Sequence, residues 1–188
     1  MSTGKISTIQ ERIVQLSRMR EYIFHTGDLA NIWQIKNKNT LYTLLKRYTQ
    51  KGLLNRIYKG LYSIDEISKL DPYLLGVKAM HGYCYVSTET VLYEAGIIAQ
   101  KTNYITLVGQ KSKKFSIGGH HYHCRQLSDR YLLQDAGIIK KNNINTATLE
   151  RAVADLLYFN PRAHFDAREH INWAKVQNMQ QILGYKKI

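Results

Sequence analysis

Proline, cysteine and long apolar runs are scarce in this chain of 188 residues. The first of its two prolines is Pro72, so no proline interrupts the 71 residues before it. The two cysteines, Cys84 and Cys124, stand forty residues apart, which argues against a disulfide framework and is typical of the reducing cytoplasm. No apolar run approaches the roughly 18 to 20 residues that a membrane span needs. The first residues are polar and charged rather than an apolar signal segment, so we expect a cytoplasmic protein that does not bind membranes.

Acidic residues are also few, because 14 Asp and Glu stand against 27 Lys and Arg, a formal net charge of +13. A chain that is 44% hydrophobic and 11% aromatic can bury a core, so we do not expect disorder. The positive excess favours a polyanionic partner, most simply nucleic acid. The first 65 residues carry 11 basic and 4 acidic residues, and the remaining 123 carry 16 and 10. The first third is therefore roughly twice as dense in positive charge.

A domain boundary is expected just before Pro72. A residue that precedes proline is pushed out of the helical region, so Leu70-Asp71-Pro72 favours a break between two structural units. No repeat and no low-complexity segment is visible. We therefore expect two domains, residues 1–66 and 67–188.

Spacings of three and four between apolar residues predict three short helices in the first domain. The first begins at Thr8, the second is capped by Thr26, and the third opens at Asn39 and Thr40 and ends at Gly52.

Two β-rich segments, 53–58 and 61–64, flank the two-residue turn Lys59-Gly60 and predict a hairpin. Three helices followed by a basic hairpin is the order of a winged helix-turn-helix, whose third helix fits a major groove about 12 Å wide. A solvated helix face, or a winged helix that binds protein, would be the alternative reading.

The outer face of the third helix is polar and basic, and it supplies the candidate DNA contacts. The side chains near its N-terminal end, which are best placed to meet base edges, are Lys38, Asn39, Thr40, Tyr42 and Thr43. The side chains further along the helix and in the hairpin, which we expect to hold phosphates without reading sequence, are Lys46, Arg47, Arg56, Tyr58 and Lys59.

The rest of the chain predicts a mixture of helices and strands, so the fold class is α+β, a winged helix-turn-helix followed by a mixed α+β domain. We expect helices over residues 74–80, 88–95, 146–157 and 167–182, and strands over residues 83–86, 104–108, 113–117 and 122–127.

Four segments occur in an order that is typical of one family: residues 51–62, 85–97, 104–108 and 147–157. The first contains Gly-Leu, a basic residue and Gly-Leu-Tyr, and the last is similar to an Ala-Thr-Pro-Glu-Arg-Ala stretch. Leu149 stands where that stretch usually has proline, which a first-turn position tolerates. In these segments the chain resembles the AbiEi-type antitoxins and transcriptional regulators of type IV (abortive infection) toxin–antitoxin systems.

This resemblance implies a DNA-binding transcriptional regulator that catalyses nothing and needs no cofactor. Its winged helix would bind operator duplex DNA and repress its own operon, and its partner would be a nucleotidyltransferase-like toxin that it counteracts. A homodimer or paired binding on the operator fits such domains.

Metal-ligand residue types cluster in His120-His121-Tyr122-His123-Cys124. On a strand, His121 and His123 share one face, so at most these two converge and they are weak metal candidates. No C-x-x-C or H-E-x-x-H pattern is present, and an exposed hairpin strand without metal is the expectation. The cluster is also the one candidate catalytic site for a rival function, a DNA-processing enzyme targeted by its winged helix.

Charged residues also gather on the helix expected over residues 146–157 and in a loop around Lys111. Glu150, Arg151 and Asp155 lie on the last strongly amphipathic helix, and we expect them to have a structural role, with Glu150 or Arg151 pairing elsewhere in the fold, rather than to form a polar site. A basic loop containing Lys111, Lys113 and Lys114 is expected to be solvated, with auxiliary phosphate contact as its alternative role.

Overall fold

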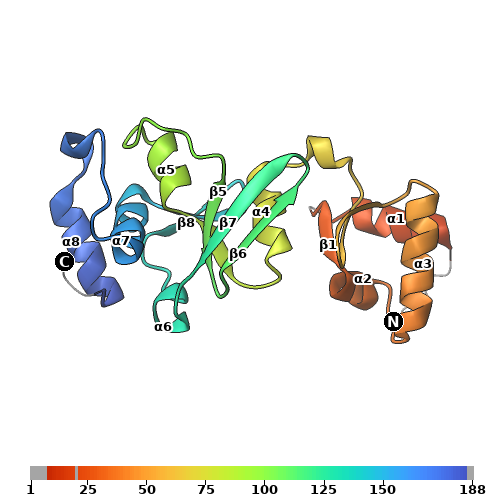
Figure 1. Ribbon diagram of the computed structural model, residues 1–188. Coiled ribbons are helices and arrows are strands. Elements are labelled where there is room, and N and C mark those ends of the chain that lie inside the picture. The colour runs from red at the N-terminus through yellow and green to blue at the C-terminus, as the bar shows by residue number, and fades with distance from the viewer. Residues whose placement is uncertain (1–7, 20, 186–188) are drawn as a thin grey trace. The chain divides into compact units, whose positions relative to one another are not determined.

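The computed structural model describes residues 8–19 and 21–185 (Figure 1). The chain divides into two compact units, residues 1–79 and 80–188. Helices and strands occur in both units, which confirms the expected α+β class. Helix α4 falls in the first unit in this division, whereas the sequence-based boundary at residue 66 assigns it to the second. Among the described residues, no helix is both long and apolar enough to span a bilayer.

The first unit combines helices with a small sheet. Its elements are α1 (Ile9–Ser17), β1 (Ile23–His25), α2 (Thr26–Ile32), α3 (Lys38–Gln50), β2 (Asn55–Tyr58), β3 (Leu61–Ser63), the short 3₁₀ helix η1 (Ile67–Lys69) and α4 (Pro72–Ala79). The sheet is antiparallel, in the order β1-β3-β2. The predicted hairpin is confirmed as β2 and β3, whereas β1 was not predicted as a strand.

The helix caps of the first unit agree with the sequence at α1 and differ at α2 and α3. Thr8 caps α1 as expected, in a capping box with Glu11. The N-cap of α2 is His25 rather than Thr26, whose hydroxyl instead donates to the Gly60 carbonyl at 3.2 Å.

Helix α3 begins at Lys38, one residue before the predicted Asn39. Asn37 is its N-cap, and the Asn37 side chain accepts a hydrogen bond from the Thr40 amide at 3.1 Å. Asn37, Asn39 and Thr40 are all residue types that cap helices, so composition alone did not decide among them. At the other end, Gly52 follows the helix with φ +67°, as its sequence position predicted.

The core of the first unit is apolar. Helices α1, α2 and α3 and the sheet each contribute to one cluster of buried side chains, which are Leu16, Phe24, Leu29, Trp33, Leu41, Leu45, Tyr48, Leu54 and Tyr62. Trp33 and Tyr48 meet edge to face with ring centroids 5.5 Å apart. Among the described residues of the first unit, no Lys, Arg, Asp or Glu is buried.

The second unit is built on a six-stranded sheet. Its elements are β4 (Cys84–Val86), α5 (Glu89–Glu94), β5 (Ile105–Gly109), β6 (Lys113–Ile117), β7 (His120–Gln126), α6 (Asp129–Leu132), β8 (Ile138–Lys141), β9 (Ile144–Ala147), α7 (Leu149–Phe159), the 3₁₀ helix η2 (Arg168–His170) and α8 (Trp173–Leu183). The strand order is β6-β7-β5-β4-β9-β8, with parallel pairing of β4 with β9 and of β5 with β7. Helix α7 contacts α5 and α8, so it lies between two helices (Figure 1).

The sequence missed the β8–β9 hairpin, and with it the start of α7. Residues 146 and 147 were expected to be helical, but they belong to β9, which pairs with β8 and β4. Thr148 then caps α7, because its hydroxyl accepts a hydrogen bond from the Arg151 amide at 3.3 Å. The β-branched and capping character of Thr146 and Thr148 fits a strand end and an N-cap better than a helix interior.

Both cysteines lie in the core of the second unit as free thiols. Cys84 on β4 and Cys124 on β7 flank Gly109 on the strand between them, where a Cβ atom would lie 2.9 Å from Cys84 Cβ and 3.0 Å from Cys124 Sγ. Burial raises the pKa of the Cys124 thiol to about 12 and also raises the pKa of Cys84. Both thiols are therefore protonated and unreactive at neutral pH.

Candidate nucleic-acid interface

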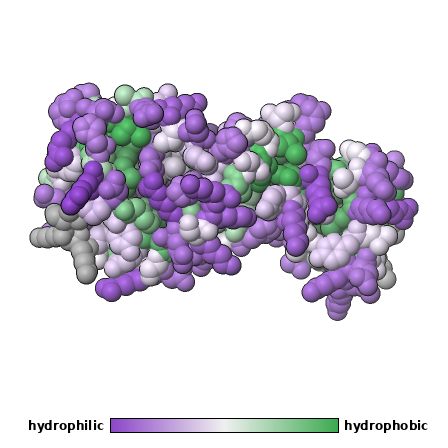
Figure 2. All heavy atoms as spheres, in the orientation of Figure 1, coloured by the Kyte–Doolittle hydropathy of each residue, from purple (hydrophilic) through white to green (hydrophobic). Residues whose placement is uncertain are grey.

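Helix α3 has two faces of opposite character. Leu41, Leu45 and Tyr48 recur at spacings of four and three and are buried in the core of the first unit. Burying this stripe fixes the rotation of the helix about its axis. The other face is thereby turned toward solvent, and the surface over α3 is mainly hydrophilic (Figure 2).

Every residue that was predicted to meet base edges lies on α3 and is exposed. Asn39, Tyr42, Thr43 and Lys46 follow helical spacings of three and four, so they form one continuous strip. Tyr42 is 55% exposed although it is aromatic. The remaining two of the predicted set, also exposed in the first turn, are Lys38 and Thr40.

One member of this strip is already hydrogen-bonded within the helix. The Thr43 hydroxyl donates to the Asn39 carbonyl at 2.9 Å. Its oxygen can still accept a hydrogen bond, whereas the Asn39 amide keeps both donor and acceptor capacity.

The predicted phosphate contacts are exposed as well. Arg47 lies on the next turn of α3, Arg56 and Tyr58 on β2, and Lys59 in the β2–β3 turn. The turn is tied to α2, because the Gly60 carbonyl accepts hydrogen bonds from both the amide and the hydroxyl of Thr26. The hairpin is thus attached at its tip to the helix that precedes α3.

The cations of this surface lack acidic partners in the described part of the chain. None of the ion pairs includes these five residues, which are Lys38, Lys46, Arg47, Arg56 and Lys59. Five of the six acidic side chains of the first unit are engaged elsewhere. Glu11, Asp28 and Asp71 accept hydrogen bonds from amides at helix starts, and Glu21 and Glu66 pair with Lys78 and Lys69. The ion pairs of the described residues therefore leave the positive charge of α3 and the β2–β3 hairpin unpaired.

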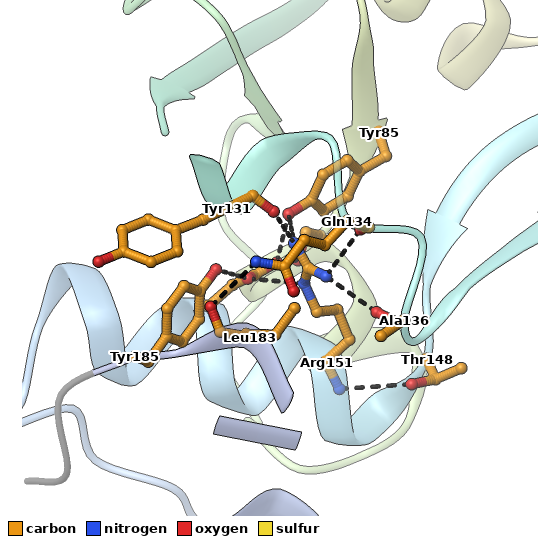
Figure 3. Close-up of polar contacts among 10 residues, drawn as sticks. Tyr85, Tyr131, Gln134, Ala136, Thr148, Arg151, Leu183 and Tyr185 are labelled. Atoms are coloured by element: carbon orange, nitrogen blue, oxygen red, sulfur yellow. Dashed lines mark hydrogen bonds and ion pairs between the residues drawn. The ribbon is translucent and has the colours of Figure 1, made fainter. Parts of the chain in front are cut away.

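Two charged residues of α7, Arg151 and Asp155, are buried in a network inside the second unit (Figure 3). Arg151 and Asp155 are both 0% exposed, and Arg151 Nε donates to Asp155 Oδ1 at 3.0 Å. Arg151 also donates to the carbonyls of Gln134, Ala136 and Tyr131 at 3.2, 2.8 and 3.3 Å. The Arg151 guanidinium is therefore hydrogen-bonded to backbone carbonyls both in α6 and in the segment that follows α6.

Three hydroxyl groups complete the network around the Asp155 carboxylate. Tyr85 on β4, Ser87 after it and Tyr185 after α8 donate to Asp155 at 3.0, 2.8 and 2.7 Å. Tyr85 also accepts from Arg151 Nη2 at 2.8 Å. No local pattern in the sequence indicates these partners, because they lie 70, 68 and 30 residues from Asp155 along the chain.

The protonation of this network is governed by burial and by the ion pair. Burial raises the pKa of Asp155, while Arg151 and the three hydroxyl groups act in the opposite direction. Burial lowers the pKa of Arg151, but the attraction of Asp155, Tyr85 and Tyr185 outweighs it, so the pKa is raised overall. Burial also raises the pKa of Tyr85 and Tyr185. With its donors and acceptors paired inside the core, this network joins β4, α7 and the residues after α8.

Glu150 takes no part in that network. It is half-buried, and its carboxylate lies 4.0 Å from Lys175 Nζ on α8. The three polar residues of α7 thus belong to two separate structural ion pairs.

The histidine strand, β7, is exposed on one side and buried on the other. His121 is exposed and its Nδ1 lies 2.8 Å from the Ser116 hydroxyl, while His123 is half-buried. The ring of Tyr104 lies 6.1 and 6.2 Å from these two histidine rings. Within the described residues, no three His, Cys, Asp or Glu side chains are grouped to hold a metal ion.

No protein-family model matches the chain, and a comparison with curated proteins finds no significant relative. The geometry of the chain itself therefore has to support any functional assignment.

Proposed function

We propose that the protein is a DNA-binding transcriptional regulator of the AbiEi-like antitoxin type, and that its first unit is a winged helix-turn-helix. In this assignment α1 and α2 support α3, the recognition helix, and the β2–β3 hairpin is the wing. The observation that carries the proposal is the exposed strip of α3, whose cations have no acidic partner among the described residues. An α-helix of this width enters the major groove, and uncompensated cations beside it attract phosphates.

The proposed roles divide along α3 and the hairpin. Residues near the start of α3 read bases, because the N-terminal part of a recognition helix meets base edges. Asn39 offers an amide that can pair with adenine N6 and N7. Arg47 and the hairpin residues Arg56 and Lys59 hold the backbone and fix the register.

The phosphate role is tested by Arg47→Ala and Lys59→Ala, measured on the DNA upstream of the protein's own gene and on random duplex. Each variant should weaken binding to both DNAs and lower the salt slope by roughly one. Arg18→Ala is the control, because Arg18 is an exposed cation of the same unit at the end of α1. Unchanged slopes in the test variants, or an equal loss in the control, would contradict the placement.

The reading role is tested by Asn39→Ala and Thr43→Ala. Asn39→Ala should lose about 1–3 kcal/mol of discrimination between operator and random duplex, with a smaller loss for Thr43→Ala, whose hydroxyl proton is engaged. Equal losses on both DNAs would rule out direct readout by this strip. An absence of any salt-dependent DNA affinity in the unmodified protein would favour a protein-interaction module instead.

The antitoxin part of the proposal rests on the resemblance of the four sequence segments. It predicts a neighbouring gene for a nucleotidyltransferase-like toxin, whose expression alone arrests growth and whose co-expression with this protein does not. Continued growth arrest on co-expression would leave a regulator without antitoxin activity.

A further inference from the structure

The second unit contains a long stretch without acidic residues. Residues 95–128 include five Lys and Arg and no Asp or Glu. One of these cations, Arg125, is neutralised by an ion pair with Glu89. Lys101, Lys111 and Lys114 are exposed, and no ion pair in the described part of the chain includes them.

Of these lysines, Lys114 lies on strand β6 at one edge of the six-stranded sheet, and Lys111 lies in the loop between β5 and β6. Strand β6 is an edge strand, and within the described part of the chain its one sheet neighbour is β7. On one side of this hairpin Lys114 stands opposite His123, and Ser116 stands opposite His121. We call these four residues, together with the adjacent Tyr104, the hairpin face.

The aromatic rings of the hairpin and of the adjacent Tyr104 already contact other side chains. Lys114 Nζ lies 5.4 Å from the centre of the Tyr104 ring, and both histidine rings also pack against it. On the other side of the hairpin, Phe115 is stacked on Tyr122 with centroids 4.9 Å apart, and Lys113 Nζ lies 4.8 Å from Phe115. A surface that binds single strands needs a free ring on which a base can stack. The hairpin face offers polar donors instead.

These donors suit phosphate oxygens. When the Ser116 hydroxyl donates to His121 Nδ1, the proton of the neutral imidazole lies on Nε2 and can be donated outward. Lys114 supplies a charge, and Tyr104, which is 39% exposed, supplies a hydroxyl group. Lysine, histidine and tyrosine donors, in a segment that has no acidic residue of its own and whose neighbour Glu89 is paired with Arg125, are the composition of a backbone-contacting site.

We propose that the hairpin face, together with Lys111 in the loop that leads into β6, is a second duplex-DNA surface that contacts the phosphate backbone. This second surface is separate from the recognition of DNA bases that is assigned to α3. The inference rests on the proposed function only for the choice of duplex DNA as the partner. It extends the contact of the protein with DNA to the second unit and adds affinity without sequence preference.

The test compares two double variants of the full chain that remove the same charge. Lys111→Ala with Lys114→Ala removes two cations at the hairpin, and Lys140→Ala with Arg162→Ala removes two exposed cations elsewhere in the second unit. Lys140 is a good match because it lies on β8, the opposite edge of the same sheet. Binding to random duplex and to a single strand of equal length is measured as the salt concentration is varied, with the melting temperature as the check on folding.

The hairpin variant should lower the salt slope for duplex by about two and weaken binding roughly tenfold or more at low salt. The control variant should keep the slope and the melting temperature of the unmodified protein. An equal loss in both variants would mean that net charge alone acts, and no loss in the hairpin variant would mean that its lysines serve only to protect a sheet edge from aggregation. A larger loss for the single strand than for duplex would also overturn the proposal.

The two proposals fail separately. If Arg47→Ala and Lys59→Ala lower the slope while the hairpin variant does not, the hairpin inference falls alone. If only the hairpin variant lowers it, duplex binding by the second unit stands and recognition by α3 falls.

Discussion

The two units use their charged residues in opposite ways. In the first unit no described Lys, Arg, Asp or Glu is buried, and the cations of α3 and the β2–β3 hairpin are exposed without acidic partners among the described residues. In the second unit Arg151 and Asp155 are completely buried and join three parts of the fold. A charge that is paired inside a fold is unavailable to a partner, so the capacity to bind a polyanion depends on where the positive charge lies rather than on its total.

The chain provides a probe for each unit, because its two tryptophans are divided between them. Trp33 is buried in the core of the first unit, and Trp173 begins α8 in the second, against Phe165. In a Trp173→Phe background the fluorescence reports the first unit, and in a Trp33→Phe background it reports the second. The stability of each unit can therefore be measured in the full chain.

The largest effect is expected from Arg151→Met. This substitution leaves the Asp155 carboxylate buried without its counter-ion and deprives three carbonyl groups of a donor. We expect the free energy of unfolding of the second unit to fall by about 3–5 kcal/mol. Urea unfolding followed through Trp173 measures this change, and the transition followed through Trp33 should not move.

The adjacent residue provides the control for this prediction. Glu150→Gln removes a half-buried carboxylate whose nearest cation, Lys175, is 69% exposed and 4.0 Å away. It should change stability by no more than about 0.5 kcal/mol. A similar loss for both substitutions would mean that the buried pair is no more important than the surface one.

The next largest effect is expected from Leu45→Ala in α3. Leu45 is 1% exposed, so its truncation leaves a cavity in the apolar core and should cost about 2–5 kcal/mol in the Trp33 transition. Tyr42→Ala on the exposed face of the same helix should stay within about 0.5 kcal/mol. If Tyr42→Ala proves as destabilising as Leu45→Ala, the two faces of α3 do not differ as the structure describes.

Local patterns in the sequence predicted the helices of the first unit well, because an amphipathic helix shows its faces in its own spacing. The buried stripe of α3 could be predicted from the sequence, and so could the exposure of the ten candidate DNA-contact residues on α3 and in the β2–β3 hairpin. The cap of α3 could not, since Asn37, Asn39 and Thr40 are similar choices until their backbone is known.

The second unit was harder to predict because its structure depends on distant partners. The spacing of Arg151 and Asp155 allowed an ion pair, but nothing local announced that Tyr85 and Tyr185 would complete a buried network. The β8–β9 hairpin did leave a signal. Asn142 and Asn143 form its turn with φ values of +50° and +65°, a conformation that asparagine tolerates in two-residue hairpin turns.

The smallest effect is expected in the pH dependence of stability, which should differ between the two units because of His123 in the hairpin face. Burial lowers the pKa of His123, and the nearby cations Arg125 and Lys114 lower it further, against a weaker opposing effect of Glu89. The folded state therefore binds the proton less readily than the unfolded state, and the second unit should lose stability as the pH falls below the ordinary histidine pKa of about 6.5. His123→Gln should remove part of this loss in the Trp173 transition and leave the Trp33 transition unchanged. A loss of equal size in the unmodified protein and the variant would show that other groups carry the pH dependence. The repulsion between Lys114 and protonated His123 would then have no measurable effect on stability.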